Sequence, residues 1–251
     1  MSLVGEMSAV KTALEPQNAF VAGASQGIPL PRPAGPTSAK SQPPATNQEL
    51  DEIKRPLFYP SRSLLFHEGG RPAGVFIVTR GTVKLSMTSS RGRTVIIRIA
   101  RAGEILGLSS VLSGDPYIAT AETLEDTEVS YVEREPFMSL LTRNPQAALS
   151  VAYQACAIYK DVCRQVSLLG LCRSASERLA QFLLNWSAPK IYRDSPSIWL
   201  GLTHEEISQI AGTTRETVTR TLIDFRKRGW AALASSNLTI QDREALEKLV
   251  A

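Results

Sequence analysis

Four side chains near the C-terminal end of the chain have the types and the spacing needed to read DNA bases. They are Arg215, Glu216, Thr219 and Arg220. On a helix these positions project together from the first two turns. An arginine guanidinium matches the O6 and N7 acceptors of guanine, and a glutamate accepts a hydrogen bond from N4 of cytosine. The alternative is a solvated helix face on which Glu216 and Arg220 form an i,i+4 charge pair.

Two short helices joined by a tight turn would present these side chains. Thr203 and Glu206 have the spacing of a capping box, which predicts the start of the first helix. Gly212 predicts the left-handed turn that ends it. Thr213 and Glu216 repeat the capping-box spacing and predict the start of the second helix. In a helix-turn-helix the N-terminal residues of the second helix enter the major groove.

The run Gly-x-Thr-Arg-Glu-Thr-Val-x-Arg, within residues 203–228, resembles the DNA-binding helix pair of the Crp/Fnr family of bacterial transcription regulators. The resemblance implies an α+β fold with an N-terminal β-roll, a long dimerisation helix and a C-terminal winged helix-turn-helix. It also implies that Arg215, Glu216 and Arg220 read a half-site like TGTGA. The residues expected to contact DNA phosphates are Thr203, Thr213, Thr214 and Lys227.

The sequence divides into four parts. Residues 1–48 hold seven prolines and few branched aliphatic residues, which predicts a disordered tail. Residues 49–143 contain many short strand patterns between glycine-rich turns, and they resemble the cyclic-nucleotide-binding β-roll of the family. Residues 144–170 predict the dimerisation helix, and residues 171–251 predict the winged helix-turn-helix.

Composition restricts the class of protein. The chain has 251 residues, 43% of them hydrophobic, and a formal net charge of +4, which permits a nucleic-acid partner. Three cysteines give no disulfide framework. No apolar run approaches the roughly 20 residues of a membrane span, and the N-terminus does not resemble a signal peptide. We therefore expect a soluble cytoplasmic protein with no membrane partner.

The phosphate-binding segment of the β-roll departs from the family pattern. Cyclic-AMP-responsive members have Gly-Glu-Leu, followed about ten residues later by Arg and a small hydroxyl residue. Here Leu108 follows Gly107, and Ile118 and Ala119 stand at the later place. Residues 102–133 include seven acids and no lysine or arginine, so a buried phosphate would lack a cationic partner, although backbone N–H groups alone can hold one. We therefore expect no ordinary cyclic AMP binding. The candidate effector pocket comprises Gly103, Glu104, Gly107, Leu108, Ile118, Ala119 and Thr120.

The sequence predicts no cofactor and no catalytic site. The oxygen-sensing branch of the family carries iron–sulfur ligands near its N-terminus, whereas this tail has no cysteine. His67 and His204, the two histidines, lie far apart in the sequence, which argues against a haem or metal site. There is also no nucleophile–base pair or phosphate-binding loop. We therefore predict that the protein is not an enzyme.

Two apolar stripes run along the predicted long helix. Asn144 is the expected N-cap of this helix, and Pro145 is expected in its first turn. A helix that is apolar on two sides must be covered twice, once by its own β-roll and once by a second copy. The two-fold axis of such a homodimer predicts palindromic half-sites. The stripe assigned to the dimer is Val151, Ala155, Ile158, Val162 and Leu169. The other is Leu149, Ala152, Cys156, Tyr159, Cys163 and Val166.

The leading hypothesis is a homodimeric, sequence-specific regulator of transcription that binds double-stranded DNA and, as an activator, would also contact RNA polymerase. The alternative is a sensor of an uncharged or apolar small molecule, or a thiol redox sensor, in which the DNA output is secondary. Cys156 and Cys163 lie one heptad apart, and we interpret them as packing residues.

Overall fold

The computed structural model describes residues 48–172, 174–187, 197–234 and 236–250. All of them belong to one compact unit, Ser38–Ala251. Residues 1–47 of the predicted disordered tail lie outside the described residues, and the last residue of that prediction, Gln48, begins a helix. Within the described ranges, no helix is both long enough and apolar enough to cross a bilayer.

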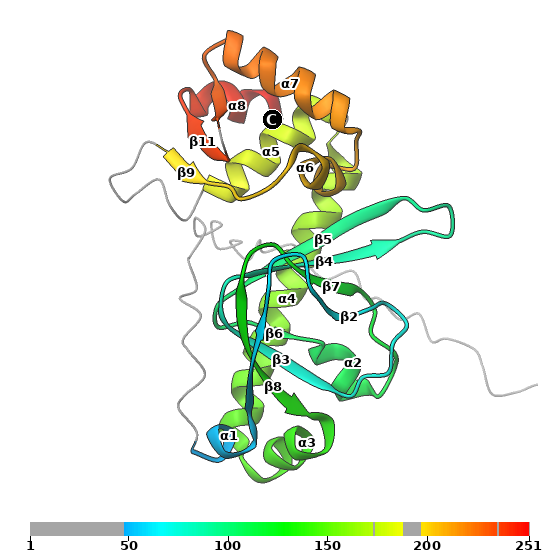
Figure 1. Cartoon of the computed structure of the whole chain (residues 1–251). Coiled ribbons are helices and arrows are strands. Elements are labelled where there is room, and N and C mark those ends of the chain that lie inside the picture. The colour runs from blue at the N-terminus through cyan, green and yellow to red at the C-terminus, as the bar shows by residue number, and fades with distance from the viewer. Residues whose placement is uncertain (1–47, 173, 188–196, 235, 251) are drawn as a thin grey trace, which may run out of the picture. The chain divides into compact units, whose positions relative to one another are not determined.

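The N-terminal half of the described chain is a β-roll with short helices at its ends (Figure 1). Its strands form two four-stranded antiparallel sheets, in the orders β1-β8-β3-β6 and β2-β7-β4-β5. The elements are α1 (Gln48–Ile53), β1 (Arg55–Tyr59), β2 (Leu64–Phe66), β3 (Gly74–Arg80), β4 (Thr82–Thr88), β5 (Thr94–Arg101), β6 (Ile105–Leu106), α2 (Leu108–Ser113), β7 (Thr120–Thr123), β8 (Thr127–Glu133) and α3 (Arg134–Arg143).

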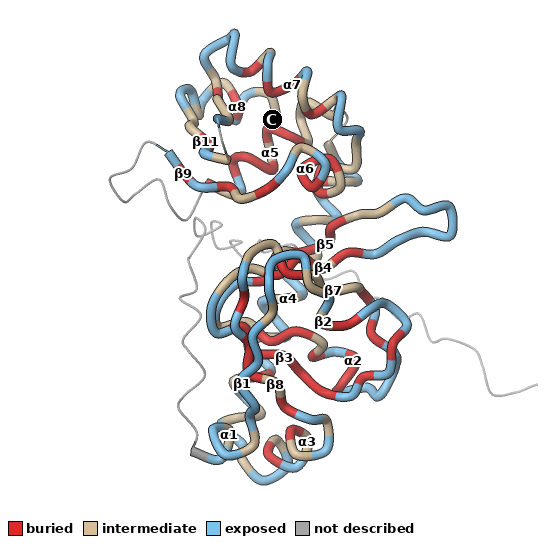
Figure 2. Tube along the Cα trace, viewed as in Figure 1, coloured by how far each residue is buried: buried red, intermediate tan, exposed pale blue. Residues whose placement is uncertain are grey.

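The apolar core of the roll lies between the two sheets. Strand β3 is a central strand and is buried along five successive residues, whereas the edge strand β1 is mostly exposed (Figure 2). Val75, Val83, Ala121 and Val132 face the core and are fully or almost fully buried. β-Branched residues suit such positions because they pack well on a pleated surface.

Helix α2 is an element that the sequence patterns did not predict. Gly107 precedes it and Gly114 follows it, and both adopt left-handed conformations, with φ of 75° and 84°. Glycine takes this conformation without the steric penalty that a side chain would cause. The glycines that indicated turns are therefore the two ends of a six-residue helix.

The long helix α4 (Pro145–Leu171) begins as predicted. The Asn144 side chain accepts hydrogen bonds from the backbone N–H groups of Gln146 and Ala147, at 3.1 and 3.0 Å, and Pro145 occupies the first turn. Val151 and Ile158 pack against the core of the roll. The start of this helix is therefore fixed by its own sequence, and its position by the apolar face that the roll covers.

The C-terminal part comprises α5 (Ala175–Ser187), β9 (Ser197–Trp199), α6 (His204–Ala211), α7 (Arg215–Lys227), β10 (Ala231–Ala234), β11 (Asn237–Ile240) and α8 (Arg243–Val250). Its strands form a three-stranded antiparallel sheet in the order β10-β11-β9. Ser174 accepts a hydrogen bond from Glu177 N–H, and Asp242 accepts one from Ala245 N–H, so side chains cap the starts of α5 and α8. The second core gathers residues of α5, α6, α7 and α8, including Leu183, Ile207, Phe225 and Leu246. The predicted fold class, a β-roll, a long helix and a winged helix-turn-helix, is confirmed.

Candidate nucleic-acid interface

The turn between α6 and α7 is set by the residues that the sequence singled out. The Thr203 hydroxyl accepts a hydrogen bond from Glu206 N–H at 3.2 Å, and the Glu206 carboxylate accepts one from Thr203 N–H at 2.9 Å. Gly212 ends α6 in a left-handed conformation, with φ of 59°. The first capping box and the left-handed turn are therefore confirmed.

The second capping box is wrong by one residue. The N-cap of α7 is Thr214, not Thr213, and its hydroxyl accepts a hydrogen bond from Thr217 N–H at 3.3 Å. Thr213 lies in the turn, where its N–H donates to the Ser208 carbonyl. The shift arises because Gly212 and Thr213 are both needed to complete the turn before α7 begins.

Three of the four predicted base-reading side chains lie exposed on the first two turns of α7. These are Arg215, Glu216 and Arg220. A hydrogen bond from its own backbone N–H, and a second from the Thr214 hydroxyl, hold the pKa of Glu216 below its ordinary value, so this group is a carboxylate at neutral pH. The opposite face of α7 is anchored by the buried Val218, Leu222 and Phe225. The exposed face thus presents two guanidinium groups and one carboxylate on a helix whose other face is buried.

Thr219 differs from the other three. Its hydroxyl lies 2.9 Å from His204 Nδ1 and donates to the Arg215 carbonyl at 3.0 Å. This side chain is only partly exposed and is engaged within the protein. It therefore links α6 to α7, and the same contact gives His204 a structural position that the sequence did not reveal.

Positive charge continues at the far end of α7. Arg226 and Lys227 are exposed in its last turn. Arg228 forms an ion pair with Asp224 at 2.9 Å and lies 4.9 Å from the centre of the Trp230 ring. Arg228 is thus engaged in packing, whereas Arg226 and Lys227 remain accessible to solvent.

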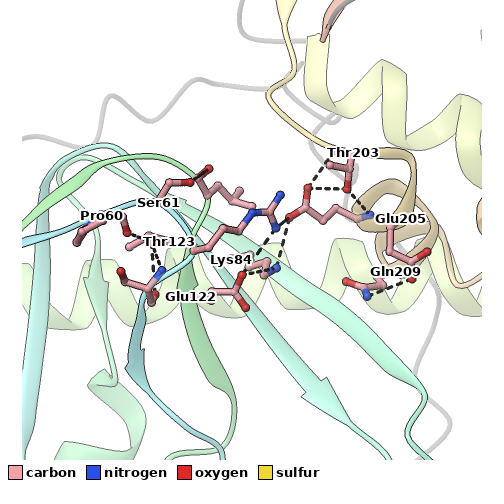
Figure 3. Close-up of polar contacts among 12 residues, drawn as sticks. Pro60, Ser61, Lys84, Glu122, Thr123, Thr203, Glu205 and Gln209 are labelled. Carbon is pink, nitrogen blue, oxygen red and sulfur yellow. Dashed lines mark hydrogen bonds and ion pairs between the residues drawn. The ribbon is translucent and has the colours of Figure 1, made fainter.

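A buried ion cluster joins the N-terminal end of α6 to the β-roll (Figure 3). The Glu206 carboxylate accepts from Arg62 Nη1 at 2.6 Å and lies 3.3 Å from Lys84 Nζ. Lys84 also pairs with Glu122 at 2.9 Å. The side chains of Glu206 and Lys84 are only 3% and 10% exposed. At a second contact, Arg93 of the β4–β5 hairpin donates to the Gly212 carbonyl at 3.1 Å. The β-roll therefore contacts both ends of α6.

Glu206 is ionised because its partners outweigh its burial. Burial alone would raise the pKa of Glu206, but hydrogen bonds from Thr203 and Arg62 and the charge of Lys84 lower it below its ordinary value of 4.5. A group whose pKa is lowered by folding contributes stability above its unfolded pKa, and this contribution is lost as the pH falls through the folded value.

Replacing Glu206 with glutamine should lower the free energy of unfolding by about 1–3 kcal/mol at pH 7, because Lys84 loses one of its two carboxylates. The difference from the unchanged protein should shrink as the pH falls below 4.5. Urea unfolding across this pH range measures both effects. Glu205→Gln is the matched control, since Glu205 is exposed on the same helix. An equal loss in the control, or a difference that does not depend on pH, would contradict this role of Glu206.

The seven residues of the predicted effector pocket line neither the small cavity between β3, α3 and α4 nor the cleft beside β1, β2 and β8. Leu108 and Ala119 are buried and Ile118 is exposed. Glu104 forms an ion pair with Arg98, a buried residue of β5. Cationic charge therefore reaches this region from a neighbouring strand, although residues 102–133 contain none. The Gly103 carbonyl and the Thr120 hydroxyl accept hydrogen bonds from Gln154 and from Glu68 N–H.

The described residues include no group of three or more His, Cys, Asp or Glu side chains placed to hold a metal ion. Cys156 and Cys163 are exposed on α4 within this single chain, and not buried as the packing interpretation expected.

Comparisons with known proteins agree with this geometry. Residues 177–249 match the model of the Crp-like helix-turn-helix domain, and residues 56–144 match that of the cyclic nucleotide-binding domain. The chain belongs to the Crp/Fnr family of bacterial transcription regulators.

Among its Crp/Fnr relatives is a protein of Thermus thermophilus named cyclic AMP receptor protein. It is 27% identical over 191 residues, which cover 76% of this chain and 86% of that protein. The nitrogen fixation regulation protein FixK of Bradyrhizobium diazoefficiens is 26% identical over 206 residues, covering 81% of this chain and 85% of FixK. The solved structure of FixK2 from Bradyrhizobium japonicum superposes with a TM-score of 0.70 at 24% identity and covers 79% of this chain and 98% of FixK2. The last match supports the fold.

Proposed function

We propose that this Crp/Fnr regulator binds a palindromic, TGTGA-like site as a homodimer. The observation that carries the proposal is the exposed group of Arg215, Glu216 and Arg220 on the first two turns of α7. Arginine and glutamate supply the donors and acceptors that distinguish G·C pairs in the major groove. Thr203, Thr213, Thr214 and Lys227 are the proposed phosphate contacts. They lie at the start of α6, in the turn before α7 and in its last turn.

The homodimer is supported by a face of α4 that its own chain leaves uncovered. Leu149, Tyr159 and Val166 are 48%, 70% and 64% exposed, and Cys156 and Cys163 lie on the same face. The stripe originally assigned to the dimer is the less suitable one. Val151 is buried, Ile158 and Leu169 pack partly buried in the chain's own cores, Val162 is partly buried and Ala155 is exposed. We therefore reassign the dimer contact to the stripe of Leu149, Ala152, Cys156, Tyr159, Cys163 and Val166.

We also propose that the protein does not respond to cyclic AMP in the usual way. The position where responsive members carry glutamate holds the buried Leu108, and the place of their arginine and hydroxyl residue holds Ile118 and Ala119. Arg98, a buried cation beside this segment, is already paired with Glu104. A cyclic phosphate entering here would have to displace that carboxylate.

Fluorescence anisotropy on a TGTGA-N6-TCACA duplex tests DNA recognition. The protein without any added ligand should bind this duplex tightly and should prefer it to a scrambled duplex of the same composition. Addition of cyclic AMP should leave the affinity unchanged. Selective binding that appears only with cyclic AMP would overturn the proposal on control, and binding that ignores sequence would overturn the proposal on the site.

The alternative function, a small-molecule sensor, is favoured by one observation, a cleft on the β-roll that is separate from the predicted effector pocket.

A further inference from the structure

Two cysteines of α4 lie on the side of the helix that faces away from the β-roll. Cys156 comes two residues after Gln154, whose side chain donates a hydrogen bond to a carbonyl of the β-roll at 2.8 Å. Cys163 comes two residues before Gln165, whose side chain donates to another carbonyl of the β-roll at 3.1 Å. Residues two apart on an α-helix project about 160° from one another. Both cysteines are accordingly exposed in the single chain.

The cysteines belong to the apolar stripe of α4 that the chain itself leaves uncovered. Its six residues are spaced alternately three and four apart, which is the spacing of the seam between two helices of a coiled coil. All six are exposed in the single chain. They are Leu149, Ala152, Cys156, Tyr159, Cys163 and Val166.

The two α4 helices of a homodimer that reads a palindrome must run in parallel. The C-terminal end of α4 leads into the DNA-binding helices, and the two recognition helices lie about 34 Å apart on one side of the DNA. An antiparallel pair would place them at opposite ends of a helix about 40 Å long. In a parallel pair related by a two-fold axis, each residue of the seam lies opposite the same residue of the partner subunit.

The separation of two such helices suits a disulfide. Packed helices have axes about 8–10 Å apart, and their Cα atoms lie about 2.3 Å from the axis. Cα atoms that face each other directly are therefore about 3–5 Å apart, and those slightly off the line between the axes are farther apart. A disulfide needs about 4.4–6.8 Å between Cα atoms. A cysteine of the seam therefore comes within bridging distance of the same cysteine in the partner subunit.

Cys156 is better placed for such a bridge than Cys163. It lies near the middle of α4, so turns of the seam on both sides hold the two helices together at this point. The Cys163 thiol shares a hydrogen bond with the Tyr159 hydroxyl of its own chain. Among the described residues, the Cys156 thiol has no such partner.

We propose, building on the homodimer proposed above, that Cys156 forms a disulfide with Cys156 of the partner subunit when a peroxide oxidises the protein. One Cys156 thiolate attacks hydrogen peroxide, which breaks the O–O bond and leaves a sulfenic acid and hydroxide. The thiol of the partner subunit's Cys156 then attacks this sulfur, so that the S–S bond forms and the sulfenic oxygen leaves as water. Two thiols and one peroxide thus give one disulfide and two waters. The oxidised protein remains a dimer at dilutions that separate the reduced subunits.

Non-reducing gel electrophoresis of the full-length protein, after treatment with hydrogen peroxide, tests this proposal. The oxidised protein should migrate at twice the mass of one chain, and dithiothreitol should return it to the mass of one chain. Cys156→Ser should abolish the covalent dimer. The matched controls Cys163→Ser and Cys172→Ser should retain it. A covalent dimer that survives Cys156→Ser, or that is lost equally in Cys163→Ser, would overturn the assignment to Cys156. Thermal melting of the three variants verifies that each is folded.

Sedimentation velocity under reducing conditions separates failure of the disulfide from failure of the homodimer. A reduced protein that sediments as a dimer but forms no covalent dimer with peroxide would overturn the disulfide alone. A protein that is monomeric both before and after peroxide treatment would overturn the homodimer and the disulfide with it.

Discussion

Replacing Arg220 with alanine should weaken binding to the TGTGA-N6-TCACA duplex by about 1–3 kcal/mol for each half-site and should relax the preference at one base position. Arg220 is exposed one turn into α7, on the same face as Glu216. Its guanidinium would form two hydrogen bonds with one guanine, and alanine removes both donors. Anisotropy against a set of duplexes with single substitutions in the half-site measures the affinity and the preference together.

Lys227→Ala provides the contrast for Arg220→Ala. Lys227 is exposed in the last turn of α7 and is proposed to contact phosphate. Its loss should weaken binding to all duplexes alike and should reduce the salt dependence of the binding constant by about one unit per contact. If Arg220→Ala also weakens all duplexes alike, Arg220 contacts phosphate and the proposed base-reading group is wrong.

Replacing Val166 with glutamate should convert the proposed homodimer to a monomer. Val166 lies on the uncovered stripe of α4, 64% exposed in the single chain. In the proposed dimer a glutamate there would be buried against its own symmetry mate, and an unpaired buried charge costs several kcal/mol. Sedimentation velocity should show a species of half the mass, and affinity for the palindromic duplex should fall at least a hundredfold because each half-site would then bind alone.

Ala157→Glu is the matched control for Val166→Glu. Ala157 is exposed on the same helix, away from the reassigned stripe, and receives the same charge. This variant should remain a dimer and bind DNA normally. If Ala157→Glu dissociates the protein and Val166→Glu does not, the reassigned stripe is wrong.

Sequence patterns predicted helix starts and ends correctly where the residues of a single turn determine the backbone conformation. Asn144, Gly212 and the pair of Thr203 and Glu206 each act within their own turn, so their spacing alone identified two helix starts and one helix end. The second capping box failed because Thr213 and Thr214 are adjacent hydroxyl residues, and the length of the turn decides which of them caps α7.

Features that depend on distant contacts were not visible in the sequence. Lys84 occupies a polar position of a strand in which apolar and polar residues alternate, yet its side chain is buried against Glu206 of α6. Arg98 is not part of the acidic segment of residues 102–133, but it forms an ion pair with Glu104 of that segment. The two stripes of α4 have similar composition, and the packing of the β-roll alone decides which one is covered. Glu206 lies 122 residues from Lys84 along the chain. Glu104 lies only six residues from Arg98, but the turn after β5 has to bring the two side chains together, so sequence spacing revealed neither ion pair.

The carboxylate of Glu206 makes contacts in both α6 and the β-roll. It completes the first turn of α6 and also neutralises Lys84 on the β-roll. Any movement of the helix pair on DNA that separates Glu206 from Lys84 must therefore break this ion pair, which costs free energy. Thermodynamic linkage makes this cost reciprocal, so a molecule that alters the β-roll near Lys84 changes DNA affinity by the same factor by which DNA changes the affinity for that molecule. The free energy of the contact between Glu206 and Lys84 is therefore an upper limit on the coupling free energy that this contact can transmit between the β-roll and DNA.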